Sequence, residues 1–192
     1  MAKRAHVTAI VVLCALLGVR AGAASSPVTL YFHSDTQASD VDEATATAGA
    51  GAGPQLVEAA PTGSNPKAAT AVVAGAQGFR KNVLGAWWAA SFSGEIGSPS
   101  VHFWAFSTAA IALDVSLFKN GPAGRTPPIA VQSVRAVDGL SEYEVLFPGT
   151  SAQVAEGIVV QIFAHTLEDQ GSNIVVLFDS TDFPSSVSFT LS

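Results

Sequence analysis

The residues of this chain that could carry catalytic chemistry are few and widely spaced. Beyond the first 23 residues the histidines are His33, His102 and His165, and each lies in a separate apolar, β-rich segment. A catalytic triad assembles in space, so this separation does not forbid one. However, the chain has no Gly-x-Ser-x-Gly elbow, and no spacing pairs two histidines on one element as a zinc site would. We therefore predict that the chain is not an enzyme.

Carboxylates are the second group that could build a site. Asp35 follows the first expected strand, and Asp179 and Asp182 flank the last expected turn. Because the first and last strands of a sandwich often lie close together, these three carboxylates could converge on a Ca²⁺ ion, which prefers hard oxygen ligands. The alternative is that the segment 179–182 caps its own turn through Asx-type hydrogen bonds. We favour the turn cap and keep calcium as an open possibility.

Aromatic residues form the third group. Trp87 and Trp88 are adjacent in an expected strand, so their side chains point to opposite faces. Trp88 lies on the apolar side of this strand and is expected to face the core, so Trp87 is expected to face outward. The same alternation gives one outward set that we predict as ligand-binding candidates: Trp87, Trp104, Phe106 and Phe163.

Two interpretations of these outward aromatics remain open. In the first, they form a platform on which sugar rings or a partner protein stack, because monomers seldom expose a large apolar patch without a use for it. In the second, which we favour, the long excursion 34–83 folds across them and makes Trp87 and Trp104 part of a smaller second core.

The elements that position these residues are short β-strands separated by Gly, Pro, Asn and Asp turns. No helix longer than about two turns is expected beyond the leader. This pattern predicts an all-β fold, a two-sheet antiparallel sandwich of the jelly-roll type. The expected strands are 28–33, 87–93, 101–107, 111–118, 129–137, 143–147, 158–165, 174–179 and 186–191. We read 34–83 as a long, partly irregular surface loop, with a short strand near 70–74.

The first 23 residues have the three-part layout of a helical signal peptide. Lys3 and Arg4 are followed by an apolar stretch over 7–19 and by the small residues of 21–23. The stretch is too short to span a bilayer, which takes about 20 residues. We therefore predict a signal peptide over 1–23, a β-sandwich domain over 24–192, and a secreted, extracellular or cell-surface location.

The net charge of the cleaved chain argues against two classes of partner. Cleavage after residue 23 removes Lys3, Arg4 and Arg20, which leaves six basic residues against fifteen acidic ones and a net charge of −9. Nucleic acids and anionic membranes require a basic patch, so neither is an expected partner of the cleaved chain. The lone cysteine, Cys14, is removed with the leader, so no disulfide or thiolate site remains. The sequence does not indicate the oligomeric state.

Three segments resemble a known type of domain: Leu30 to His33, Ala60 to Lys67, and Val175 to Leu191. They look like a poorly characterised, jelly-roll-like β-sandwich domain of exported bacterial proteins. They are also distantly similar to accessory domains of secreted hydrolases. The resemblance implies a sandwich in an extracellular setting, and it carries over no catalytic residue.

We accordingly predict a secreted, non-catalytic module that binds a glycan or another surface polymer. The alternative is a structural or adhesive cell-surface protein that self-associates through its edge strands.

Overall fold

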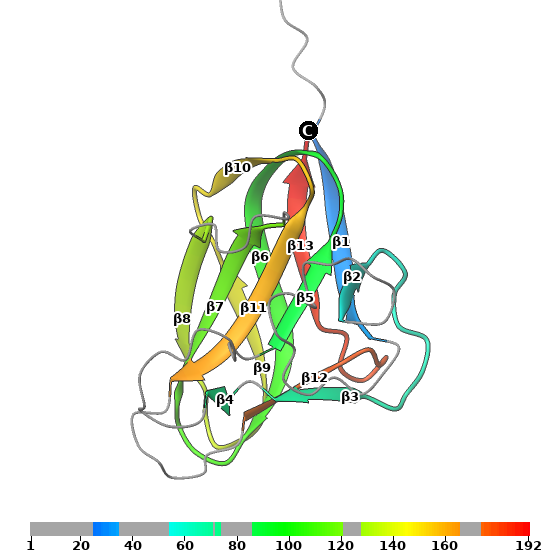
Figure 1. Ribbon diagram of the computed structural model, residues 1–192. Coiled ribbons are helices and arrows are strands. Elements are labelled where there is room, and N and C mark those ends of the chain that lie inside the picture. The colour runs from blue at the N-terminus through cyan, green and yellow to red at the C-terminus, as the bar shows by residue number, and fades with distance from the viewer. Residues whose placement is uncertain (1–24, 35–53, 71, 74–85, 121–127, 166–173) are drawn as a thin grey trace, which may run out of the picture.

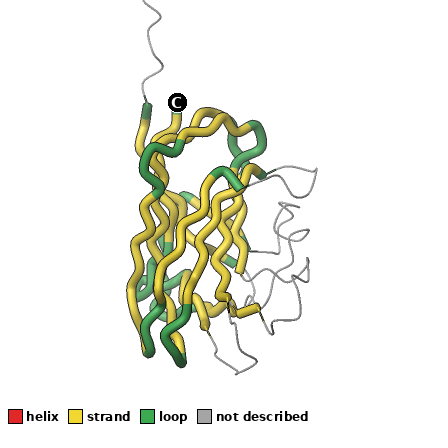
Figure 2. Tube along the Cα trace, turned by 90° about the vertical axis from the view of Figure 1, so that its left-hand side faces the viewer, coloured by secondary structure: helices red, strands yellow, loops and turns green. Residues whose placement is uncertain are grey.

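The described part of the protein is built of strands and loops. The computed structural model describes residues 25–34, 54–70, 72–73, 86–120, 128–165 and 174–192 (Figure 1). The expected signal peptide and most of the excursion 34–83 lie outside these residues. No helix occurs among the described residues (Figure 2), and the prediction of an all-β fold is confirmed. Within the same ranges, no helix is long and apolar enough to cross a membrane.

The described residues form thirteen strands. Their bounds are β1 (Ser26–His33), β2 (Gln55–Val57), β3 (Lys67–Thr70), β4 (Val72–Val73), β5 (Ala86–Ala90), β6 (Gly94–Ser107), β7 (Ala112–Lys119), β8 (Ala130–Arg135), β9 (Gly139–Leu146), β10 (Ser151–Val154), β11 (Ile158–His165), β12 (Ile174–Phe178) and β13 (Ser186–Leu191).

Hydrogen bonds join these strands into one open sheet. Its main path is β3-β12-β6-β13-β1-β2-β5-β11-β7-β8, with β9 and β10 paired to β6 and β4 paired to β11. Most pairs are antiparallel, but β2 with β5 and β4 with β11 are parallel. The expected wholly antiparallel arrangement is therefore wrong at these two places. Both exceptions involve strands from the excursion 34–83: β2, which was not expected, and β4, which lies within the short strand expected near 70–74.

The sheet folds over a shared aromatic core. Trp88 of β5 stacks on Phe32 of β1 with ring centroids 4.3 Å apart, and it also meets Phe178 of β12 edge-on at 5.2 Å. Strands β5 and β12 are far apart in the hydrogen-bonded strand order, so this contact requires the sheet to fold back on itself. The part with β5, β11, β7 and β8 then faces the part with β12, β6, β13 and β1. Figure 1 accordingly shows β5, β11, β7 and β8 in front of β6 and β13.

The hydrogen-bonded link between these two parts is short. Strand β2 pairs with three residues of β1, but with β5 it shares the single pair Gln55 and Ala89. Burial of apolar side chains from both parts therefore contributes more to holding them together than backbone hydrogen bonds do. The fully buried set includes Phe32, Trp88 and Phe178.

Strand β6 runs through a segment that was expected to be a turn. Gly97-Ser-Pro99 lies inside a 14-residue strand. The register with β13 shifts there, because Ser188 pairs with Ser100 whereas Thr190 pairs with Gly97. Ser98 has a positive φ of 48°. Such a bulge accommodates Pro99, which has no N–H to donate to a ladder. The turn residues thus bend a strand instead of ending it.

Candidate functional site

The outer side of β6 carries the side chains that alternate with its buried ones. Val101, Phe103 and Ala105 are buried in the core. His102, Trp104 and Phe106 therefore point to the opposite side, since successive residues of a strand alternate between faces. This agrees with the outward direction expected for Trp104 and Phe106.

Neighbouring strands add apolar and acidic residues to this side. Phe106 lies opposite Leu140 of β9 and Val175 of β12, and Trp104 lies opposite Glu142 of β9. Phe106 is 44% exposed and Leu140 is 46% exposed. We call this surface the β6 outer face and define it by Trp104, Phe106, Leu140, Glu142, Glu144, Val175 and Leu177.

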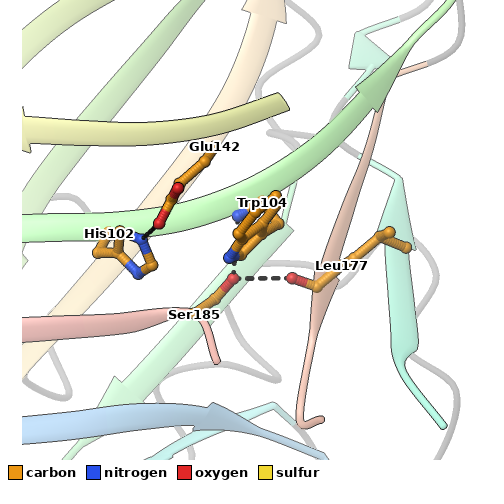
Figure 3. Close-up of polar contacts among 5 residues, drawn as sticks. All are labelled: His102, Trp104, Glu142, Leu177 and Ser185. Atoms are coloured by element: carbon orange, nitrogen blue, oxygen red, sulfur yellow. Dashed lines mark hydrogen bonds and ion pairs between the residues drawn. The ribbon is translucent and has the colours of Figure 1, made fainter. Parts of the chain in front are cut away.

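Trp104 is fixed in place by the turn that precedes β13. Its ring is half-buried and meets Phe183 edge-on, with the ring centroids 5.5 Å apart. Its backbone N–H donates to the hydroxyl of Ser185 at 3.2 Å, and that hydroxyl donates to the carbonyl of Leu177 at 2.7 Å (Figure 3). The aromatic ring is therefore held on a rigid element, as a contact residue requires.

His102 and Glu142 form a polar pair beside Trp104. The distance between His102 Nε2 and Glu142 Oε1 is 2.5 Å (Figure 3). The two side chains are 30% and 54% exposed, so the carboxylate remains open to solvent. Glu144, opposite His102 on β9, is also exposed. Strands β6, β9 and β12 contain no lysine or arginine, so this surface is apolar at its centre and acidic at its border.

The other two predicted ligand-binding aromatics lie elsewhere. Trp87 belongs to β5 and Phe163 to β11, in the part of the sheet that does not contain β6. Trp87 is only 2% exposed and packs against Phe118 with ring centroids 5.2 Å apart. Phe163 is half-buried and lies opposite Asp114. The four aromatic residues therefore do not form one surface, and Trp87 offers no open ring face.

A second polar cluster surrounds Asp179 at the end of β12. Its Oδ2 lies 2.9 Å from His33 Nδ1 and 2.9 Å from Lys67 Nζ, and its side chain is 13% exposed. Burial raises the pKa of Asp179, but hydrogen bonds from His33 and Lys67, together with their charges, outweigh burial and lower the pKa below its usual value. The cluster thus ties β1 and β3 to the turn after β12.

These contacts bear on the calcium hypothesis. Asp35 lies outside the described residues, and Asp182 is exposed. The Asp179 carboxylate already contacts two nitrogen atoms, a surrounding that suits an ion pair. Among the described residues, no group of three or more His, Cys, Asp or Glu side chains could hold a metal ion. Calcium binding stays a prediction, and Asp179 is the partly buried member of the predicted ligand set among the described residues.

The side chain that caps the turn 179–182 is Ser180, and not Asp179 or Asp182 as predicted. Ser180 Oγ accepts from the N–H of Asp182 and donates to the carbonyl of Ser64, both at 3.1 Å. The N–H of Thr181 donates to the carbonyl of Gly63 at 2.8 Å. The turn is therefore capped locally and also fastened to the loop 58–66.

The histidines occupy separate places. His33 contacts Asp179, and His102 contacts Glu142. His165 lies on β11, and its side chain is outside the described residues. The structure therefore gives the two described histidines different carboxylate partners on different strands.

Comparison with known proteins gives the fold and no family. No protein-family model matches the chain, and no curated protein matches it. Solved structures do match. An aminopeptidase from the marine sediment archaeon Thaumarchaeota archaeon aligns with a TM-score of 0.57 at 11% identity, over 88% of this chain and 37% of that one.

Two further solved structures give the same result. A CocE/NonD family hydrolase from Staphylococcus aureus aligns at a TM-score of 0.54 with 9% identity, and an α-amino acid ester hydrolase at 0.53 with 12% identity. The alignments cover 88% of this chain, but only 37% and 36% of the hydrolases. The chain thus shares its fold with roughly a third of each hydrolase chain.

The acidic border of the β6 outer face was not predicted from the sequence. The expected strand 143–147 did not include Glu142, whereas β9 begins at Gly139 and contains it. The signal that could have revealed it is the alternation of Leu140, Glu142, Glu144 and Leu146, which places all four side chains on one side of a strand.

Proposed function

We propose that this chain is an exported, non-catalytic β-sandwich module that binds a glycan through the β6 outer face. The leader-like residues 1–23 support export, and the core shared by the two facing parts of the sheet supports a two-sheet, jelly-roll-like sandwich. The similarity to about a third of three hydrolase chains supports a module that accompanies catalysis without performing it.

The observation that carries this proposal is the pairing of Phe106 with Leu140. Both are large apolar side chains, they lie directly opposite each other on neighbouring strands, and they are 44% and 46% exposed. Exposing two such side chains together costs solvation free energy that a monomeric domain normally avoids. Contact with a ligand would recover that free energy.

The surroundings of this pair suit a sugar chain. The ring of Phe106 and the partly exposed Trp104 offer apolar faces against which the C–H side of a pyranose ring can pack. Glu142 and Glu144 offer exposed carboxylate oxygens that accept hydrogen bonds from sugar hydroxyls. A sheet surface is also rigid, so little conformational entropy is lost when it binds.

Affinity electrophoresis and pull-down with a panel of polysaccharides test the proposal. Phe106→Ala should weaken binding to a retained polysaccharide by about tenfold or more, because it removes the central contact. Val131→Ala is the matched control, since Val131 is 45% exposed but lies on β8. The proposal fails if no polysaccharide is retained, or if both variants bind like the unaltered protein.

The same similarity to hydrolases favours a second candidate function, an accessory domain that serves a hydrolase. Both functions predict that the purified chain does not turn over ester or peptide substrates. Turnover that is lost on replacement of His33 or His102 by alanine would contradict both, because these are the two described histidines with a carboxylate partner.

A further inference from the structure

We infer that the ligand of the β6 outer face carries positive charge as free amines, and that its chemical class is a glycan of unacetylated amino sugars. This inference rests on the proposed function and adds the charge of the ligand to it. The charges that border the apolar centre of the face support it.

The border of the face is acidic on the side of β9. Glu142 lies opposite Trp104, and Glu144 lies opposite His102 on the same side of the sheet. Both glutamates are exposed, and Glu142 is 54% exposed even with its contact to His102. Two carboxylates therefore stand next to the aromatic rings without being buried.

Among the described residues of this face, the basic side chain that contacts these carboxylates is His102, which pairs with Glu142. Strands β6, β9 and β12 and the turn 179–185 contain no lysine or arginine, and the turn adds the exposed Asp182. The whole chain has a net charge of −6. A ligand that approaches this face therefore meets a negative potential, which favours cations and repels anionic polymers.

An amino sugar matches both properties of the face. Its ring presents C–H groups to Phe106 and Trp104, while its ammonium group can pair with Glu142 or Glu144 and interact with the face of an aromatic ring. His102 holds Glu142 beside Trp104 through the contact at 2.5 Å. A neutral sugar chain would make the packing contacts but not the ion pairs.

The test compares oligosaccharides that differ only in the amine. Glucosamine oligomers, their N-acetylated counterparts and glucose oligomers of equal length are titrated into the full chain by calorimetry. We expect the glucosamine oligomers to bind tightest and to weaken as salt is raised, since screening reduces interactions between exposed charges. This arm uses the unaltered protein and does not depend on any variant folding.

A second arm uses charge-removing variants. Glu142→Gln combined with Glu144→Gln should weaken binding of the glucosamine oligomer about three- to tenfold, the loss expected for two exposed ion pairs. Glu58→Gln combined with Glu156→Gln is the matched control, because both residues are exposed and lie outside the face. The control should bind like the unaltered protein.

The outcomes separate this inference from the proposed function. Equal binding of N-acetylated or glucose oligomers overturns the inference and leaves glycan binding standing. Equal weakening in both double variants, or equally tight binding of oligolysine, also overturns it, since net charge alone would then explain the affinity. If none of the oligosaccharides binds, the inference and the proposed function fail together.

Discussion

The backbone N–H of Trp104 donates a hydrogen bond to the side-chain hydroxyl of Ser185 at 3.2 Å. Strand β6 changes partner at this point, from β12 at Leu177 to β13 at Ser186. A side-chain hydroxyl thus bridges the place where two neighbouring strands diverge, because Ser185 also donates to the carbonyl of Leu177 at 2.7 Å. The position of the aromatic ring on the β6 outer face is therefore coupled to one serine.

Replacing Ser185 with alanine removes only a hydroxyl group, but it should clearly lower the free energy of unfolding. Ser185→Ala leaves the N–H of Trp104 and the carbonyl of Leu177 without their partner in a buried place, and we expect a loss of about 1–3 kcal/mol in the free energy of unfolding. Urea denaturation measures this. Ser188→Ala is the control, since its hydroxyl meets Thr29 at an exposed site and its removal should cost less than about 0.5 kcal/mol. Equal losses in the two variants would contradict the bridge.

Gly157 should tolerate no side chain. It has a φ of 98°, and a Cβ there would overlap the carbonyl oxygen of Ala90. Gly157→Ala should therefore cost more than about 4 kcal/mol, or prevent folding, as steric overlap adds to the backbone penalty. Gly149→Ala isolates that penalty, because Gly149 has a φ of 69° and no atom within 4 Å of its added Cβ. It should cost about 1–2 kcal/mol. Thermal melting of both variants checks that Gly157→Ala is the more destabilising of the two.

Acid should destabilise the protein through Asp179. Its pKa is lowered in the folded state, so its contacts with His33 and Lys67 add stability above the pKa of an unfolded aspartate, about 3.9. That stability is lost as the pH falls through the still lower folded pKa. Asp179→Asn should cost about 1–3 kcal/mol at pH 7 and weaken the decline in unfolding free energy between about pH 5 and pH 2. Asparagine also accepts the φ of 58° at this position, so backbone strain does not confuse the result. An unchanged acid dependence in the variant would contradict this role.

Trp88 and Trp104 should differ in their contribution to stability. Trp88 is fully buried between Phe32 and Phe178, so Trp88→Ala should cost about 3–5 kcal/mol. Trp104 is only half-buried and lies on the outer side of β6, so Trp104→Ala should cost clearly less. Guanidinium denaturation followed by far-UV circular dichroism compares the two. Equal losses would mean that Trp104 belongs to the core.

Much of the strand pattern could be predicted because it depends on local alternation. The strands 158–165 and 186–191 were predicted with the bounds that β11 and β13 have. In 186–191 apolar residues recur at every second position, and 158–165 is a short run rich in β-branched residues. Both signals are contained within a few residues of chain. Gly97-Ser-Pro99 shows the limit of such signals, since the same residue types serve a turn or a bulge, and pairing with β13 selects the bulge.

The alternation within each strand was enough to predict which aromatic side chains point away from the apolar side, but their exposure depends on the tertiary packing. Trp87 and Trp104 have the same outward parity, yet Trp87 is 2% exposed and Trp104 is half-buried. Parity depends on one strand alone, whereas exposure depends on what packs against it from distant parts of the chain. The pairing of β9 with β6 likewise placed Glu142 and Leu140 beside the rings, a contact across more than thirty positions of sequence that no local pattern contains.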